Sequence, residues 1–356
     1  MTKKKKVFVG LSGGVDSSVS AALLIEQGYD VIGIFIKVWQ PDFLECTWKQ
    51  ERLDAIRVAT HLGIPFVTLD LAKEYKKSVA DYMIKAYKNG LTPNPDVMCN
   101  KTIKFGAFFE WARTRGADFV ATGHYARNLF NKKNNLYELH AGNDKEKDQS
   151  YFLWILNQKQ LSHTLFPVGN YKKEQVRVLA KKFKLFTTDK KDSQGLCFVG
   201  KLDMKDFLKN FIPEQRGVVL NEQKEKIGYH DGASFYTIGQ RHGFVIEKKS
   251  PKDKPFYIIN KNIKTNTLIV SHKKSNHIAQ EKKEIKISSI NWISGIAPQE
   301  KEQFLVRVRY RQPLQSCVIQ QPKEGSIVFD KPQIVASGQS AVFYQDSLCL
   351  GGGIMQ

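Results

Sequence analysis

A glycine turn near the N-terminus constrains this chain more than any other feature. The run Gly10-Leu11-Ser12-Gly13-Gly14-Val15-Asp16-Ser17-Ser18 follows the apolar segment Val7–Val9 and opens an amphipathic stretch, which predicts a strand, a tight turn and a helix. Adjacent glycines let the backbone bend sharply and approach a ligand closely. The N–H groups and the dipole at the start of the helix favour an anion in the turn, and the serine hydroxyls add donors for phosphate oxygens. The alternative is a plain glycine turn before a serine-capped helix.

The ending of this turn separates it from the common phosphate loop. It lacks the Gly-Lys-Ser/Thr sequence whose lysine reaches the β- and γ-phosphates of a nucleotide. The Ser-Gly-Gly-Val-Asp-Ser string resembles instead the pyrophosphate loop of the ATP pyrophosphatases, which cleave ATP between the α- and β-phosphates and adenylate a substrate. This resemblance implies an adenine nucleotide alpha hydrolase-like fold.

The first half of the chain alternates predicted strands and helices. The strands are Val7–Val9, Val31–Ile36, Phe66–Leu69 and Asp118–Thr122, and the helices are Asp16–Gln27, Gln50–Leu62, Glu74–Lys88 and Ile103–Arg113. Such alternation predicts an α/β domain with a doubly wound parallel sheet, which binds ligands at the carboxyl ends of its strands. The glycine turn after the first strand lies at that edge.

Beyond residue 201 the pattern changes to short strands separated by polar turns, among them Phe235–Ile238 and Phe304–Tyr310. This spacing is typical of a small barrel or sandwich. We therefore expect a catalytic domain over residues 1–201, a small, mostly β central domain over 202–280 and a C-terminal β-barrel domain over 281–356.

Charge and cysteine content narrow the function classes. The 356 residues carry 55 Lys+Arg against 35 Asp+Glu, a net charge of +20, and this excess suggests a polyanionic partner such as a nucleic acid. Five widely spaced cysteines without a Cys-x-x-Cys pair argue against a zinc ribbon or an iron–sulfur cluster. The chain has neither a signal-peptide pattern nor an apolar run that could span a bilayer, so we expect a cytoplasmic protein without membrane contact.

Two segments place a cysteine in a setting that suggests chemistry. In Gly90–Asn100, two prolines are expected to hold the chain extended up to Asp96, with Cys99 just before a helix whose dipole would stabilise a thiolate. Asp96 could move protons to or from a reacting group. In Lys190–Gly200, glycines flank Cys197 and neighbouring lysines would lower its pKa. An inert buried cysteine and an incidental linker cysteine are the respective alternatives.

Three further segments are candidates for contact with RNA. At helical spacing, Lys173, Arg177, Lys181 and Lys184 form a basic face, and Arg307, Arg309 and Arg311 alternate along a predicted strand beside Tyr310. Solvated faces are the alternative for both. The loop Lys147-Asp148-Gln149 precedes an expected apolar helix, Tyr151–Leu156, and an ordinary capped helix start is its alternative.

Taken in order, these segments resemble the tRNA-specific 2-thiouridylases, which make 2-thiouridine at the wobble position. The resemblance covers nearly the whole chain and rests on Ser12–Ser18, Thr92–Asn100, Ala121–Tyr125, Lys147–Leu153, Phe166–Gly169, Asp192–Gly200, Thr237–Arg241 and Leu350–Ile354. Side chains at Ile36 and Val38 depart from the methionine and asparagine common in the family, and Ala336-Ser337-Gly338-Gln339 departs from its usual Thr-Pro-Gly-Gln.

The resemblance implies a set of site residues. ATP, accompanied by Mg²⁺, would bind along Gly10, Leu11, Ser12, Gly13, Gly14, Val15, Asp16 and Ser17, with Ile36 and Gly123 around the adenosine. Asn94, Pro95 and Asp96 would meet the target uridine, which must leave its stack to reach the site. Lys147, Asp148, Gln149, Arg309 and Tyr310 would touch tRNA.

The same resemblance implies the reaction. ATP would adenylate the C2 oxygen of uridine 34, releasing pyrophosphate, and a persulfide sulfur on Cys197 would then displace AMP. A persulfide donor protein or relay would supply the sulfur. Cys99 would free the sulfur by forming a disulfide with Cys197, or attack first itself, and Asp96 would serve as general acid/base.

Two other functions remain open from the sequence. Another pyrophosphate-loop enzyme, such as an amide- or lysidine-forming ligase, would explain the first domain and leave both cysteines without a task. A non-catalytic RNA-binding protein could use ATP only as a structural ligand. Dependence on Cys197 separates the first from a thiouridylase, and release of pyrophosphate separates the second.

Overall fold

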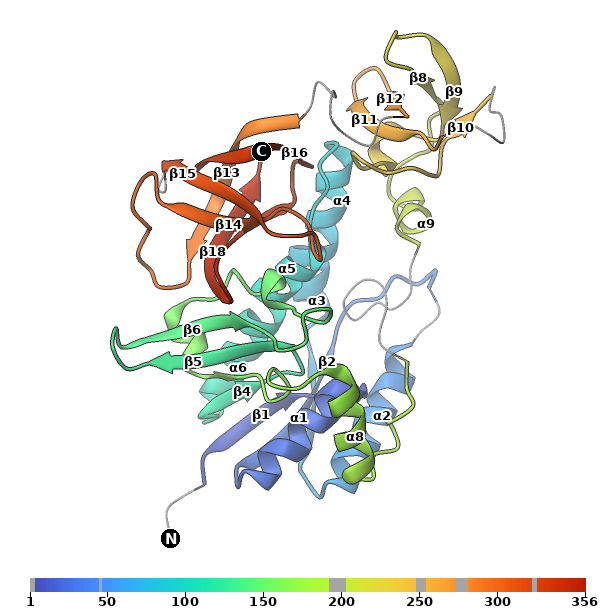
Figure 1. The fold of residues 1–356 in the computed structure, drawn as a ribbon. Coiled ribbons are helices and arrows are strands. Elements are labelled where there is room, and N and C mark those ends of the chain that lie inside the picture. The colour runs from blue at the N-terminus through green and yellow to red at the C-terminus, as the bar shows by residue number, and fades with distance from the viewer. Residues whose placement is uncertain (1–3, 45–46, 192–202, 248–253, 273–280, 322–324) are drawn as a thin grey trace.

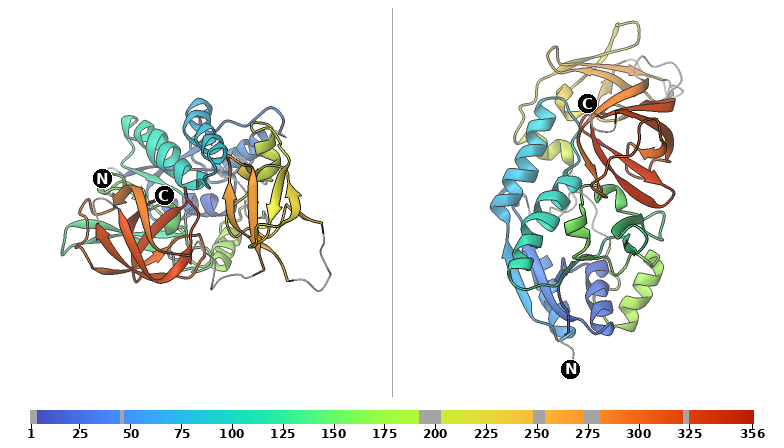
Figure 2. Two further views of the ribbon diagram at one scale, coloured as in Figure 1. Left: turned by 90° about the horizontal axis from the view of Figure 1, so that it is seen from above. Right: turned by 90° about the vertical axis from the view of Figure 1, so that its left-hand side faces the viewer.

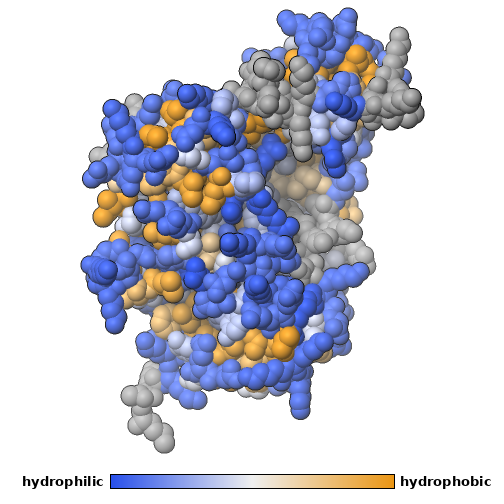
Figure 3. Space-filling view, viewed as in Figure 1, coloured by the Kyte–Doolittle hydropathy of each residue, from blue (hydrophilic) through white to orange (hydrophobic). Residues whose placement is uncertain are grey.

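The computed structural model describes residues 4–44, 47–191, 203–247, 254–272, 281–321 and 325–356 (Figure 1). The described strands form a five-stranded parallel sheet, a second five-stranded sheet and an eight-stranded sheet. The parallel sheet lies at one end of the molecule and the two β-rich units lie at the other, with helices between them (Figure 2). Hydrophilic side chains cover most of the face seen in Figure 3. Within the described ranges, no helix combines the length and the apolar character needed to cross a bilayer.

The N-terminal sheet confirms the predicted doubly wound α/β fold. Its order is β3 (Phe66–Asp70), β2 (Asp30–Lys37), β1 (Lys6–Gly10), β4 (Phe119–Ala121) and β7 (Thr164–Leu165). Alternate β1 side chains enter different cores: Val7 and Val9 join the core with α1 (Val15–Glu26) and α2 (Trp48–His61), whereas Phe8 joins the core on the opposite face. Because the chain winds outward from β1 in both directions, β1 and β4 border the switch point where such sheets bind ligands.

The opposite face is covered by two long helical segments. One comprises α3 (Ala72–Tyr75), the π-helical η1 (Lys76–Ala80) and α4 (Asp81–Lys88). The other comprises α5 (Pro95–Cys99), the π-helical η2 (Asn100–Phe108) and α6 (Phe109–Thr114).

The start of the second segment corrects the expectation that Cys99 precedes a helix. Asn94 caps α5, since its Oδ1 accepts the Val97 N–H at 3.2 Å. Pro95 occupies the first helical position, where its fixed φ suits the helix and its missing N–H costs nothing. Pro95 therefore begins the helix rather than delaying it, and Cys99 lies one turn inside.

The C-terminal strands close a six-stranded antiparallel barrel. The strands are β13 (Glu281–Trp292), β14 (Gln303–Arg307), β15 (Gln315–Gln321), β16 (Ser326–Ile334), β17 (Ser340–Gln345) and β18 (Leu348–Met355), and pairing of β13 with β18 completes the ring. The hairpin of β5 (Ala126–Asn131) and β6 (Leu136–Ala141) extends this sheet through β18. This hairpin belongs to the predicted first domain, so the sheet crosses the predicted boundary.

The central unit holds β8 (Gly217–Leu220), β9 (Lys226–His230), β10 (Val245–Ile246), β11 (Tyr257–Asn262) and β12 (Thr267–Ser271). The helical elements not yet named are η3 (Ser150–Phe152), α7 (Gln158–Leu161), α8 (Lys173–Lys182), α9 (Met204–Lys209) and η4 (Ala233–Phe235). Phe207 and Leu208 of α9 pack in the same core as Phe8 and Cys99, which ties the central unit to the helical layer of the first.

Three local predictions were wrong, and tertiary contacts explain them. The expected helix over Tyr151–Leu156 is only the short turn η3, because Tyr151 and Trp154 turn into the barrel and donate hydrogen bonds to Ser340. The strand expected over Phe304–Tyr310 ends at Arg307, so its three arginines do not share one strand face. The strand expected over Phe235–Ile238 is the end of η4 followed by a loop.

Candidate active site

The glycine turn forms a preorganised loop between β1 and α1. Gly13 adopts a positive φ of 71°, and a Cβ there would lie 2.7 Å from the carbonyl oxygen of Glu51, so the position requires glycine. Ser17 Oγ accepts the Ser12 N–H at 3.3 Å and lies 3.2 Å from Ser12 Oγ. Gly14 caps α1, whose first N–H groups face the turn as in known anion sites.

The remaining residues expected to bind ATP line this turn or the strand edge beside it. Leu11 and Val15 are buried and anchor the loop in the core, while Gly10 ends β1. Gly123 follows β4 and approaches the loop so closely that a Cβ would lie 2.8 Å from the Ser17 nitrogen. Ile36 lies near the carboxyl end of β2 with a buried side chain, which leaves its backbone for contact with a ligand.

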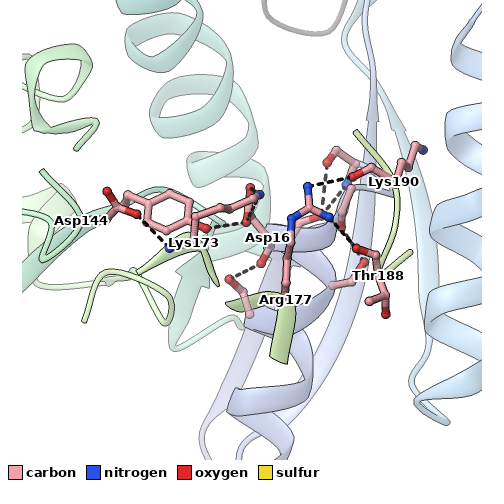
Figure 4. Close-up of polar contacts among 12 residues, drawn as sticks. Asp16, Asp144, Lys173, Arg177, Thr188 and Lys190 are labelled. Atoms are coloured by element: carbon pink, nitrogen blue, oxygen red, sulfur yellow. Dashed lines mark hydrogen bonds and ion pairs between the residues drawn. The ribbon is translucent and has the colours of Figure 1, made fainter. Parts of the chain in front are cut away.

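Lys173 reaches Asp16 in the first turn of α1 (Figure 4), and a tyrosine hydroxyl contacts the same carboxylate. Lys173 Nζ lies 2.7 Å from Asp16 Oδ1 and 2.9 Å from Oδ2, and Tyr125 donates its hydroxyl to Oδ1 at 2.7 Å. Only 11% of the Lys173 side chain is exposed. The charge is therefore held beside the start of α1, where phosphate oxygens are expected.

A second lysine reaches the other side of the same turn. Lys190 Nζ donates to the Gly13 carbonyl at 3.1 Å and pairs with Asp54 Oδ2 at 2.8 Å. Burial raises the pKa of the neighbouring Glu51 carboxyl, and the charge of Asp54 raises it further against the opposing effect of Lys190. Arg177 donates to the Lys190 and Thr188 carbonyls and fixes this segment (Figure 4).

These contacts correct the expectation of a basic tRNA-facing stripe on α8. Lys173 and Arg177 turn inward to the glycine turn and its supporting segment, while Lys181 and Lys184 are exposed. The apolar side of α8 agrees with the prediction, since Val176 and Ala180 are fully buried. Lys173 of α8 and Lys190, which follows that helix in the chain, instead place positive charge at the glycine turn.

The segment expected to meet the target base is held by hydrogen bonds to the barrel and to the central unit. Thr92 donates its N–H to the Ser337 carbonyl at 2.8 Å, and Gln339 Nε2 donates to the Thr92 and Pro93 carbonyls at 2.9 and 3.1 Å. Thr92 Oγ1 also reaches Thr237 Oγ1 of the central unit at 3.3 Å. Asn94, Pro95 and Asp96 follow directly and are half-buried.

The cysteines separate into distinct environments. Cys99 is fully buried at the end of α5, one turn from Asp96. Cys197 and Cys46 lie outside the described residues. Burial raises the pKa of the Cys317 thiol to about 12 and raises that of Cys349 as well, which makes both barrel thiols poor nucleophiles.

The residues expected to touch tRNA have internal partners. Asp148 is buried, accepts the Gly142 N–H at 3.1 Å, and pairs with Arg307 at 3.3 Å. Gln149 Oε1 accepts the Tyr125 N–H at 3.0 Å. Lys147 is half-buried.

Arg309 and Tyr310 bridge the barrel to the other units. Arg309 donates to the Ile238 carbonyl at 2.7 Å, and burial lowers the pKa of its guanidinium. The ring of Tyr310 packs against Phe152 with centroids 4.5 Å apart, and the Phe152 carbonyl accepts a hydrogen bond from Asn100 beside Cys99. Direct contact of these residues with tRNA stays a prediction.

Comparison with known proteins agrees with this arrangement. Three family models match in order: "tRNA methyl transferase HUP domain" over residues 5–201, "tRNA methyl transferase PRC-barrel domain" over 205–272 and "Aminomethyltransferase beta-barrel domain" over 282–355. The tRNA-specific 2-thiouridylase MnmA of Francisella tularensis subsp. novicida (strain U112) is 45% identical over 99% of both chains. Its namesake from F. tularensis subsp. tularensis (strain WY96-3418) is 44% identical with the same coverage. This chain belongs to the tRNA-specific 2-thiouridylase family.

A solved structure, the U34-tRNA thiolase NcsA from Methanococcus maripaludis, is 21% identical over 59% of this chain and 69% of its own. Its TM-score against this chain is 0.38.

In this thiouridylase-family chain, several side chains at the site were not singled out as site residues from the sequence. Asp54 comes from a segment without a motif, and the only sequence signal at Gln339 is the departure of Ala336–Gln339 from the family's usual Thr-Pro-Gly-Gln. Only the fold brings these two side chains to the two loops. Lys190 stands in the segment that carries Cys197, and its position there gives no sign of a contact with the glycine turn. Thr237 lies in a segment for which spacing alone suggests a tight turn and no chemical role.

Proposed function

We propose that this chain is an ATP-dependent tRNA uridine 2-sulfurtransferase. It activates the C2 oxygen of wobble uridine 34 by adenylation and replaces that oxygen with sulfur from a persulfide, giving 2-thiouridine, AMP and pyrophosphate. The observation that carries the proposal is the glycine turn at the sheet's switch point, with two inward lysines, in a chain of the thiouridylase family. The substrate is tRNA, and a persulfide donor protein or relay supplies the sulfur. We expect the reaction in the cytoplasm.

Activation is needed because a carbonyl oxygen of uridine is a poor leaving group. Attack of that oxygen on the α-phosphate of ATP forms an adenylated base and releases pyrophosphate. The N–H groups of the glycine turn, with Lys173 and Lys190, stabilise the pyrophosphate charge once phosphate oxygens replace the carboxylates of Asp16 and Asp54. Gly123 and Ile36 border the adenosine.

Asp16 and Ser17 fit the nucleotide's metal ion, because Mg²⁺ prefers carboxylate, hydroxyl and phosphate oxygens. When bound with ATP, the ion neutralises phosphate charge. Among the described residues, no group of three His, Cys, Asp or Glu side chains could hold a metal ion without the nucleotide.

Sulfur transfer is the second step of the reaction and takes place beside the segment that begins at Asn94. The terminal sulfur of a Cys197 persulfide attacks C2, and AMP leaves with the bonding electrons of the C2–O bond. The Cys99 thiolate then attacks the Cys197 sulfur, which leaves the transferred sulfur on the base and forms a Cys99–Cys197 disulfide for an external thiol to reduce. In the alternative order, Cys99 attacks C2 first. Asp96 is the general acid/base.

The test measures two products on an unmodified tRNA transcript with a persulfide donor. Wild-type protein should release labelled pyrophosphate and form 2-thiouridine, detected by nucleoside mass spectrometry. Cys197→Ala should abolish thiolation, whereas the matched control Cys317→Ala, in the barrel core, should retain it. Full turnover by Cys197→Ala would favour a ligase, and tRNA binding without pyrophosphate release would favour a non-catalytic RNA-binding protein.

A further inference from the structure

Lys104 lies in the π-helical part of the helix that carries Cys99. Hydrogen bonds in a π-helix connect residues five apart, so residues at that spacing lie on nearly the same side of the helix. Lys104 follows Cys99 by five residues, and the segment η2 is π-helical from Asn100 to Phe108. In a regular α-helix the same spacing would turn the two side chains well apart. The unusual helix therefore places a cation on the cysteine's side.

The ammonium of Lys104 is positioned by a buried histidine. Lys104 Nζ lies 3.3 Å from His124 Nε2, and Thr122 Oγ1 lies 2.7 Å from His124 Nδ1. Since a lysine ammonium has only donors, Nε2 must accept, and the ring's proton is on Nδ1 and is donated to Thr122. Burial, with the nearby charge of Lys104, holds the pKa of His124 well below its usual range. His124 is therefore a fixed neutral acceptor.

This contact brings the cysteine-bearing helix to the nucleotide edge of the sheet. Thr122 and His124 follow β4, which pairs in parallel with β1, so they lie beside the strand that leads into the glycine turn. Gly123, between them, abuts the first turn of α1. The neutral imidazole of His124 orients the ammonium and carries no charge itself, whereas Lys173 and Lys190 are oriented by the carboxylates of Asp16 and Asp54. The Lys104 ammonium therefore extends from the helix that carries Cys99 to the strand edge beside the glycine turn.

We propose that Lys104 is a catalytic residue of the thiolation, which contacts the α-phosphate of the adenylated uridine and stabilises the charge that AMP carries away. His124 is its positioning residue. This inference rests on the proposed function and names a side chain that function had left without a task. Lys104 acts by charge: it offers N–H donors to phosphate oxygens in both steps, and no proton need move. A single donor aimed at developing charge is commonly worth about 100-fold or more in rate.

The test compares Lys104→Met with Lys101→Met, a matched control at an exposed position of the same helix. At saturating ATP and tRNA, Lys104→Met should slow single-turnover pyrophosphate release and 2-thiouridine formation about 100-fold, and Lys101→Met should not. His124→Gln, whose amide can accept from the ammonium and donate to Thr122, should retain most activity, and His124→Leu should lose it. If His124 had only a structural role, both variants would lose thermal stability, and His124→Gln would not keep activity that His124→Leu loses.

A second measurement covers the case in which Lys104→Met does not fold. Wild-type protein is acetylated with and without α,β-methylene-ATP, and lysine modification is read by mass spectrometry. The analogue should protect Lys104 and leave Lys101 reactive. Wild-type rates in Lys104→Met, or equal acetylation of Lys104 in both conditions, would overturn the inference while wild-type thiolation still stands. Absence of thiolation by the wild-type protein would instead overturn the proposed function.

Discussion

Gln339 is the barrel side chain that holds the loop expected to meet the target base. Its Nε2 donates to the Thr92 carbonyl at 2.9 Å and to the Pro93 carbonyl at 3.1 Å. Its backbone is tied separately, since its N–H bonds to Ala336 and its carbonyl accepts from Met355. Replacing Gln339 with alanine therefore removes the two loop contacts and leaves the turn's own bonds in place.

The expected effect follows from two lost hydrogen bonds. Each has a net contribution of about 0.5–1.5 kcal/mol, so the loop loses about 1–3 kcal/mol of positioning free energy. If this loss appears in the reaction barrier, kcat falls about 5- to 150-fold. The KM for ATP should change little, because the glycine turn is held by other residues. Gln339→Glu should be worse, since it sets a carboxylate against two carbonyl oxygens.

The assay is steady-state 2-thiouridine formation on an unmodified tRNA transcript, with the melting temperature measured alongside. Gln333→Ala is the matched control: this glutamine bonds Gln315 and Lys331 within the barrel, at 3.3 and 3.0 Å. It should keep wild-type kcat. Wild-type kcat in both Gln339 variants would refute the reasoning, as would a melting temperature that falls with no change in kcat.

Three further predictions concern Gly123, Cys317 and His124. Gly123→Ala should lower thermal stability and nucleotide affinity, because the new Cβ would lie 2.8 Å from the α1 backbone. In the control Gly10→Ala, the new Cβ would lie 3.8 Å from its nearest atom, so this variant should fold normally. Equal melting curves for the two variants would contradict this prediction. Cys317, with its pKa raised to about 12, should resist iodoacetamide at pH 8 until urea unfolds the protein, and rapid alkylation of the native chain would show otherwise. His124 has a folded-state pKa below its unfolded value, with the Lys104 charge facing it, so its contribution is intact above about pH 6.5 and is lost as the pH falls below that. The stability advantage of wild type over His124→Gln should therefore shrink as the pH falls, and a pH-independent difference would remove this histidine from the acid response.

Local sequence pattern was enough to predict most of the N-terminal parallel-sheet unit. The helix expected over Asp16–Gln27 is Val15–Glu26, and the strand expected over Val31–Ile36 is Asp30–Lys37. These elements are bounded by glycines and have strong apolar periodicity, so local and tertiary preferences agree. The prediction failed where local and tertiary preferences compete. The segment that begins at Tyr151 does not form the expected helix, because the Tyr151 hydroxyl and the Trp154 indole N–H donate hydrogen bonds to Ser340.

The residue order by itself determined the glycine turn, its strand and helix, and the segments that carry Asp96, Cys99 and Cys197, because each depends on neighbours in the chain. Tertiary structure alone decided which charges face the turn. Lys173 and Asp16 are 157 residues apart, and Gln339 and Thr92 are 247 apart, yet both pairs are in hydrogen-bond contact. Such contacts depend on how sheets and helices pack, and no local spacing encodes them. The same packing turns α8, which was predicted to face RNA, toward the glycine turn.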